Sequence, residues 1–240
     1  MPLDDDQVER VLEVTAHPDD VDFGAAGTVA RFTDRGIEVT YCVCTDGDAG
    51  GFDLGLARAD IPGIRRAEQI AAAKEVGVRD VRFLGFQDGR LTVTLELRRD
   101  ISRVIRDVRP DRALIPSPER NWARLAASHP DHLAAGEAAI FAVYPDARNP
   151  FAHPELLRDE GLAAWTVREV WLMAHPQPDH FVDVSDCLDR KLAALRAHES
   201  QTAHMADLDR MVGDWLRRNA ELAGLGRDRY AEAFKVVAVG

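Results

Sequence analysis

Short apolar runs rich in β-branched residues alternate with longer stretches of helical periodicity along the first half of the chain. This pattern predicts strands at 11–15, 37–45, 81–84 and 113–115, separated by helices at 29–32, 65–76 and 95–108. Strands that alternate with helices of this kind form βαβ units and a parallel sheet. The expected fold is α/β, a three-layer Rossmann-like sandwich with a mainly parallel β-sheet flanked by helices.

The second half continues the alternation with longer irregular segments. A helix is expected at 133–143, strands at 167–173 and 181–184, and a helix at 187–199 that Ser185 or Asp186 would cap. The apolar segment 233–239 would close the sheet or one of its edges. Since no repeat, low-complexity tract or flexible linker divides the chain, we expect one domain over 1–240.

The composition excludes some classes of protein but does not indicate which reaction the protein catalyses. The 41 acidic and 30 basic residues give a net charge of −11, which argues against nucleic acid or an anionic membrane as the main partner. No apolar run reaches the roughly 18 residues of a membrane span. Three sparse cysteines and an N-terminus without a secretion signal indicate a reducing cytoplasm. Two of them, Cys42 and Cys44, would share one face of a strand as packing residues.

Two short motifs concentrate imidazole and carboxylate groups. His17-Pro18-Asp19-Asp20 directly follows the first predicted strand, and His129-Pro130-Asp131-His132 precedes a predicted helix. Ligand sites in such sheets lie beyond the carboxyl ends of the strands, where the first motif falls. Together the motifs can supply two histidines and one aspartate to a metal, which suits catalytic Zn²⁺ and also Fe²⁺ or another divalent ion. Surface or capping histidines are the alternative interpretation.

These two motifs, in this order, resemble the PIG-L (LmbE-like) family of zinc-dependent N-deacetylases. The resemblance covers nearly the whole chain, because it extends to Gly27-Thr28, Thr45-Asp46-Gly47, Arg65-x-x-Glu68, Leu84 to Gly89, and Lys191 through His198-x-x-Gln201. One departure is Val21, which stands where the commonest form of the first motif has glutamate.

The resemblance implies a role for several residues. His17, Asp20 and His132 match the zinc ligands, and Asp19 matches the general base. His129 matches the histidine that stabilises the oxyanion or protonates the leaving amine. Arg65 and Asp88 resemble the positions that contact the sugar.

Some roles stay open from the residues themselves. Asp131 could hold the ring of His129 in one tautomer, or it could be an ordinary helix-start carboxylate. Arg65 could instead lie on the solvated face of a helix. His198 and Gln201 share one helix face that could point to a pocket or to solvent, and Trp122 could line a substrate mouth or pack.

The function expected from this resemblance is metal-dependent removal of an N-acyl group, acetyl in the first instance, from an amino sugar or related glycoconjugate. The same metal core would serve an amidase of larger thiol or sugar conjugates, with specificity set by the loops at 47–63 and 144–165. A nucleotide-binding Rossmann-like protein is disfavoured because two adjacent carboxylates stand where a phosphate-binding loop would lie and would repel a pyrophosphate. A non-catalytic binding protein of the same fold is disfavoured because all the matched ligand and base positions are intact. A small-molecule substrate is expected, and homo-oligomers are known in the family.

Overall fold

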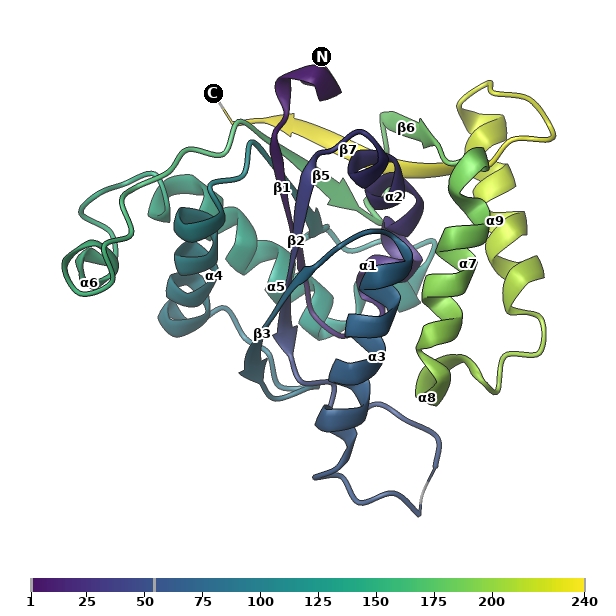
Figure 1. Ribbon diagram of the computed structural model, residues 1–240, viewed down its shortest axis with the longest axis horizontal. Coiled ribbons are helices and arrows are strands. Elements are labelled where there is room, and N and C mark those ends of the chain that lie inside the picture. The colour runs from purple at the N-terminus through teal and green to yellow at the C-terminus, as the bar shows by residue number, and fades with distance from the viewer. Residues whose placement is uncertain (1, 54, 240) are drawn as a thin grey trace.

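Seven strands join in one sheet in the order β3-β2-β1-β4-β5-β7-β6 (Figure 1). The structure is a computed structural model that describes residues 2–53 and 55–239. The strands are β1 (Arg10–Thr15), β2 (Glu38–Thr45), β3 (Asp80–Phe86), β4 (Arg112–Pro116), β5 (Glu169–Met173), β6 (His180–Asp183) and β7 (Ala231–Ala238).

The sheet is mainly parallel, as the alternating pattern predicts. Strands β3, β2, β1, β4 and β5 pair in parallel, whereas β7 runs antiparallel to both β5 and β6. The order along the sheet changes direction at β1, which lies between β2 and β4. In open α/β sheets this switch point leaves a crevice at the carboxyl ends of the strands. The first histidine motif follows β1 at that point.

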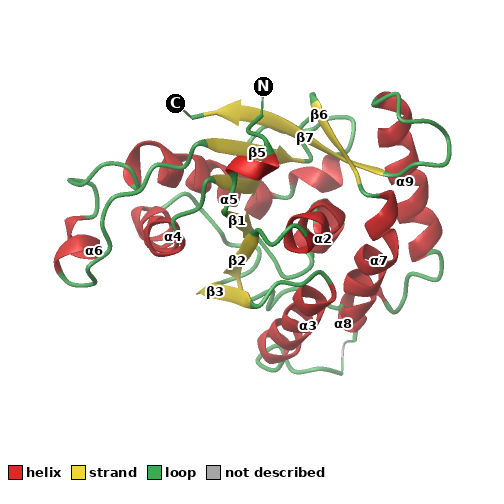
Figure 2. Cartoon of the chain, turned by 45° about the horizontal axis from the view of Figure 1, so that its top comes forward, coloured by secondary structure: helices red, strands yellow, loops and turns green. Residues whose placement is uncertain are grey.

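Helices cover both faces of the sheet and complete the expected three layers (Figure 2). Helices α4 and α5 lie on one face, and α2, α3 and α7 lie on the other. No described helix is long and apolar enough to cross a lipid bilayer. The helices are α1 (Asp20–Gly24), α2 (Ala26–Asp34), α3 (Ile61–Glu75), α4 (Leu95–Val108), α5 (Pro130–Phe141), α6 (Pro154–Arg158), α7 (Leu188–Ala197), α8 (Glu199–Thr202) and α9 (Leu208–Leu222).

Strand alternation sorts the side chains of β1 between two apolar cores. Leu12 and Val14 face α4 and α5, and Val11 faces α2 and α3. Cys42 and Cys44 are free thiols buried in the first of these cores, which confirms that they are packing residues. The apolar layers therefore fix β1 from both sides, and the loop that follows it starts from a rigid point.

Two details of the second half differ from expectation. Ser185 does not cap the predicted helix, because its hydroxyl donates to Asp183 and residues 185–187 form a short 3₁₀ turn before α7. Helix α9 was not predicted. Its buried residues Leu208, Val212, Leu216 and Ala220 recur every four positions, which is the helical pattern that buries one face.

The segment 144–165 lies away from the strand ends that carry the histidine motifs. The guanidinium of Arg106, in the last turn of α4, donates to carbonyls of Asp146, Asn149 and Ala152. The indole of Trp165 donates to the carbonyl of Pro110, which precedes β4. This segment therefore does not line the strand ends of its own chain, contrary to the expectation that it sets specificity there.

We predict that Gly136→Ala destabilises the protein, because the carbonyl oxygen of Pro116 occupies the position that an added Cβ would need. Forced overpacking of this kind costs about 1–3 kcal/mol. The matched control is Gly63→Ala in α3, where an added Cβ meets nothing; it should stabilise by about 0.4–1 kcal/mol. Urea denaturation measures both changes, and equal stability of the two variants would refute the prediction.

Candidate active site

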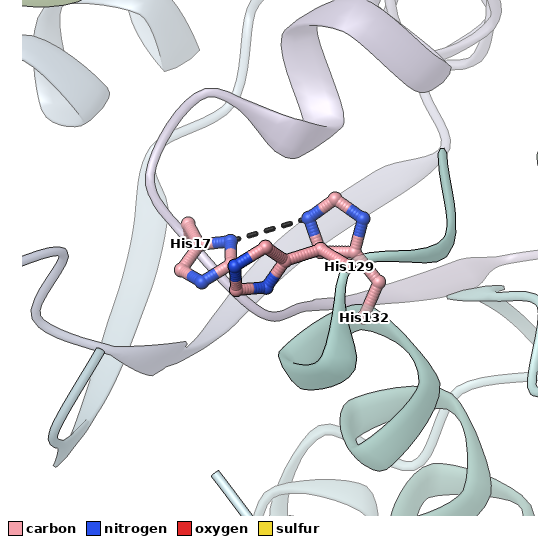
Figure 3. A group of neighbouring side chains, drawn as sticks. All are labelled: His17, His129 and His132. Carbon is pink, nitrogen blue, oxygen red and sulfur yellow. Dashed lines mark hydrogen bonds between the residues drawn. The ribbon is translucent and has the colours of Figure 1, made fainter. Parts of the chain in front are cut away.

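Three histidines from two distant parts of the chain converge at the carboxyl end of β1 (Figure 3). His17 lies in the turn between β1 and α1, whereas His129 and His132 lie at the start of α5. His129 is the N-cap residue of α5, and its Nδ1 accepts a hydrogen bond from the backbone N–H of Asp131 at 3.2 Å. The proline at the first helical position fixes the backbone there.

The three predicted metal ligands, His17, Asp20 and His132, lie close to one another at the carboxyl end of β1. His17 Nδ1 lies 3.2 Å from His132 Nε2, and His132 Nε2 lies 3.0 Å from Asp20 Oδ1. Asp20 Oδ2 lies 3.6 Å from His17 Nδ1. Donors that share one tetrahedral zinc at about 2.0–2.2 Å are about 3.3–3.6 Å apart. Two of the separations found here, 3.0 and 3.2 Å, are shorter than this range, and the two histidines approach different oxygens of Asp20, so binding of one ion by these three side chains requires small shifts of the donors. His17, His129 and His132 form a second candidate group, with donor atoms within 4.8 Å of one another.

Hydrogen bonds outside this triangle orient the three donors. Backbone N–H groups of Ala16 and His17 donate to Asp20 Oδ2 at 3.1 and 2.8 Å. His132 Nδ1 lies 3.5 Å from the carbonyl oxygen of Ala127, which favours a proton on Nδ1 and a free lone pair on Nε2. The tautomer is the one that a metal ligand needs.

The other nitrogen of His17 faces two buried carboxylates. His17 Nε2 lies 3.2 Å from Asp131 Oδ2 and 3.1 Å from Asp88 Oδ1. Asp131 also accepts hydrogen bonds from the backbone N–H groups of Gly89 and Leu91. The carboxylate of Asp131 therefore orients His17 and not His129, which corrects the expected partner. A carboxylate behind a ligating histidine fixes its tautomer and raises its basicity.

Three carboxylates surround His17, and their negative charge favours a cation at this position. Burial disfavours its charged ring, but Asp20, Asp131 and Asp88 outweigh burial and raise the pKa of His17 to about 12. Burial also opposes ionisation of Asp20, yet His132 and His17 hold its pKa well below the ordinary value. Three carboxylates around one imidazole are balanced either by protons or by a metal ion, so the donor set fits a divalent metal.

His129 differs from the other two histidines because no carboxylate pairs with its ring among the described residues. Burial and the neighbouring His17 and His132 lower its pKa, so the neutral ring is favoured. Since its Nδ1 accepts from the N–H of Asp131, the proton of the neutral ring resides on Nε2. His129 therefore has a proton to donate.

Asp19 has an unusual backbone conformation, with φ at 95° and ψ at −26°, which non-glycine residues rarely adopt. Its Oδ2 accepts from Arg65 Nη2 at 3.1 Å, and the same Nη2 donates to the carbonyl of Pro18 at 2.5 Å. Burial raises the pKa of the Asp19 carboxyl to about 6, and Arg65 opposes that rise. A carboxylate that ionises near neutral pH is suited to general-base chemistry.

Arg65 lies inside the protein and not on a solvated helix face, since it is 3% exposed. The turn after β2 closes over it, and its Nη1 donates to the carbonyl of Gly47 at 3.2 Å. A Cβ on Gly47 would lie 2.5 Å from the guanidinium, and one on Gly50 would also collide with it. Glycine at these two positions thus lets the loop cover Arg65.

A chain of buried hydrogen bonds supports Asp19 from behind, and it includes residues that the sequence alone did not indicate. The backbone N–H of Asp19 donates to Gln69 Oε1 at 2.8 Å, and Gln69 Nε2 donates to Asp22 Oδ2 at 2.8 Å. His198 Nε2 lies 2.7 Å from the same oxygen. His198 is therefore a buried support of the site and does not face solvent.

The remaining predicted positions differ in exposure: Asp88 is buried, Gln201 is half-buried and Trp122 is exposed. Asp88 is 8% exposed, and beyond His17 its Oδ2 accepts from the backbone N–H of Ala49 at 3.3 Å. The contacts of Arg65 and Asp88 with substrate stay a prediction. Gln201 donates to its neighbour Ser200. Trp122 is 80% exposed and therefore does not pack in the core.

A family model matches the part of the chain that carries both histidine motifs. The profile of the family described as PIG-L: GlcNAc-PI de-N-acetylase matches residues 12–143, which is more than half of the chain and includes both histidine motifs. The chain belongs to the PIG-L family. The resemblance noted from the two motifs is therefore confirmed.

Relatives within the PIG-L family match over most of their length. Diacetylchitobiose deacetylase of Thermococcus kodakarensis is 35% identical, with 96% of this chain and 84% of that protein covered. A probable N-acetyl-alpha-D-glucosaminyl L-malate deacetylase 2 of Bacillus cereus is 36% identical over 82% of this chain and 86% of its own. The solved N,N'-diacetylchitobiose deacetylase from Pyrococcus horikoshii superposes with a TM-score of 0.88, at 30% identity, covering 97% of this chain and 85% of that one.

We predict that Asp131→Asn weakens metal binding, because the amide cannot serve His17 as a charged acceptor. Loss of such a carboxylate partner typically lowers metal affinity about 10–100-fold. Competition with a zinc-binding dye measures the change. The control is Asp159→Asn, whose carboxylate pairs with Arg158 in α6. Unchanged affinity in Asp131→Asn would show that its contact with His17 does not support the metal.

Proposed function

We propose that this PIG-L family member is a metal-dependent hydrolase that removes an N-acyl group, acetyl in the simplest case, from an amino sugar or related glycoconjugate. The observation that carries the proposal is the triangle of His17, Asp20 and His132 donors, with Asp19 and His129 beside it. The relatives add support, because their names describe deacetylases of N-acetylglucosamine compounds.

His17, Asp20 and His132 would hold the metal, with zinc expected and Fe²⁺ or another divalent ion as alternatives. When bound, zinc would supply a water of lowered pKa and polarise the amide carbonyl. The protein groups around the triangle fix the donors in place, since Asp131 and Asp88 contact the outer nitrogen of His17.

Asp19 is the proposed general base. Its carboxylate is not one of the three donors, and it adjoins Asp20 in the turn, so it can accept a proton from the attacking water. Arg65 holds one oxygen of the carboxylate, and Gln69 holds the backbone N–H of the same residue. These contacts fix both the position and the direction of the base before substrate binds.

His129 is the proposed donor on the other side of the scissile amide. Its ring centroid lies 5.0 Å from that of His17 and 5.4 Å from that of His132, so its ring borders the metal-ligand triangle. Water adds to the amide carbonyl, the C–N bond then breaks, and the nitrogen leaves as an amine after it gains a proton. A hydrogen bond from His129 to the oxygen or nitrogen that gains charge would favour this step.

The direct test is amine release from a panel of N-acetylated amino sugars, including N-acetylglucosamine and N,N'-diacetylchitobiose. We expect release from at least one of them with about one divalent ion bound per chain, and its loss on addition of a chelator. Activity should return when zinc is restored. Release that persists in fully metal-free protein would contradict the proposal, as would no release from any substrate by the metal-loaded protein.

We predict that Asp19→Asn keeps the metal but lowers kcat by about 10²–10⁴-fold, the usual contribution of a general base. Metal analysis and turnover of the same preparation separate the two effects. The matched control is Asp60→Asn at the start of α3, where the exposed side chain makes no capping hydrogen bond; it should retain full activity. Normal turnover by Asp19→Asn would remove this residue from the role of base.

A further inference from the structure

A cavity of about 460 Å³ adjoins the metal-ligand triangle on the side away from Arg65 and Asp88. Asp20 and His132 form part of its wall, whereas Asp88 contacts His17 through the opposite ring nitrogen. The rest of the wall comes from α1, the loop between β4 and α5, the end of β5, and α9. Its apolar residues include Phe23, Met173, Ala174, Pro176, Pro178 and Trp215.

Arg124 is the only arginine or lysine among the described residues that line this cavity. Its guanidinium lies over the indole of Trp215, 4.5 Å from the ring centroid. Within the described chain, no carboxylate or carbonyl oxygen accepts a hydrogen bond from this guanidinium. Arg124 is an exposed residue, and its guanidinium has no carboxylate partner within the described chain, so its N–H donors are available to a ligand at the cavity wall.

The loop that carries Arg124 is tied in place across the cavity. The side chain of Asn121 accepts from the backbone N–H of Arg124 at 3.1 Å and donates to the carbonyl of Ala174, beyond β5, at 3.4 Å. Ser128 Oγ accepts from the backbone N–H of Asn121 at 2.7 Å. The position of the guanidinium is therefore defined from the backbone side as well as by the indole.

The contact with Trp215 leaves the N–H donors of the guanidinium available. It is a cation–π contact of the guanidinium with the indole ring and involves no hydrogen-bond acceptor, so the fork of N–H donors stays free to bind a ligand. Such a fork matches the two oxygens of a carboxylate, and one arginine neutralises one carboxylate. A phosphate carries more charge and is usually held by several cations or backbone N–H groups, which this largely apolar wall does not supply.

We propose that Arg124 and Trp215 form a subsite beside the catalytic centre that binds a carboxylate carried by the substrate. This inference rests on the proposed function, because it describes a second feature of the substrate of the same site. The subsite confers preference for acidic substrates on a protein whose net charge of −11 otherwise repels them.

The carboxylate can belong to either side of the amide that is cleaved. It can be carried by the substituent on the amino sugar, as in N-acetylglucosaminyl malate, or by the acyl group, as in N-succinylglucosamine. Both place an anion near the metal-ligand triangle, so the geometry of Arg124 serves either one. Two matched pairs of substrates distinguish these sources.

The experiment measures kcat/KM of the metal-loaded protein for each pair. One pair is N-acetylglucosaminyl malate and its dimethyl ester; the other is N-succinylglucosamine and N-butyrylglucosamine. We expect the wild type to prefer the acidic member of one pair. In Arg124→Gln the ratio of acidic to neutral kcat/KM should fall about 10–100-fold, the usual size of a lost hydrogen bond to a charged group. Arg124→Lys, which keeps the charge without the fork, should lie between.

Arg120→Gln is the matched control, because Arg120 lies in the same loop and stacks on Trp122 but does not line the cavity. It should keep both the activity and the ratio. An unchanged ratio in Arg124→Gln, or an equal loss for both members of a pair, would overturn the subsite while leaving the deacetylase proposal intact. No hydrolysis of any substrate by the wild type would instead refute the proposed function itself.

Discussion

The site depends on the balance of charge around one imidazole. Asp20, Asp88 and Asp131 all place an oxygen within 3.6 Å of a ring nitrogen of His17. Carboxylates this close repel one another in a partly buried setting, so a cation at the centre of the cluster stabilises it. A proton on His17 can serve as this cation. A divalent ion is better suited, because His132 and Asp20 offer further ligand atoms next to Nδ1 of His17. Metal binding and the stability of this end of the sheet are therefore expected to be linked.

The parallel sheet supplies the rigid frame for this balance. Strand β1 has apolar cores on both faces, and its carboxyl end opens at the change of strand order. The turn that follows places Asp19 and Asp20 side by side. Asp20 belongs to the proposed donor triangle, whereas Asp19 lies outside it as the proposed base. The positive φ of Asp19 is a conformation of raised energy, and the hydrogen bonds from Arg65 and to Gln69 oppose its relaxation.

The sequence was sufficient for the features that depend on local pattern. Alternating strands and helices predicted the parallel sheet, and the two histidine motifs predicted which side chains meet, because strand ends and proline-marked helix starts are local signals. The partners of these residues were not predictable in the same way. Arg65 reaches Asp19 over 46 positions, Asp131 reaches His17 over 114, and His198 reaches Asp22 over 176. The periodicity of a helix such as α3 shows which residues share a face, but it does not show that a buried arginine will be accommodated by glycines in another loop.

Residues far from the proposed metal ligands hold the turn that carries Asp19 and Asp20 in place. Lys191 of α7 donates to the carbonyls of Asp22 and Phe23 in α1, and it pairs with Glu232 of β7 at 2.7 Å. Glu232 in turn accepts from the backbone N–H groups at 27 and 28 in the first turn of α2. Lys191 and Glu232 are fully buried, and removing one partner of such a pair typically costs about 3–5 kcal/mol because the other charge stays unpaired. The family match ends at residue 143, yet α7 and β7 beyond it hold the turn that carries Asp19 and Asp20. The geometry of the proposed base and metal ligands is thus a property of both halves of the chain, since the second half supplies the buried charges that position the motif in the first.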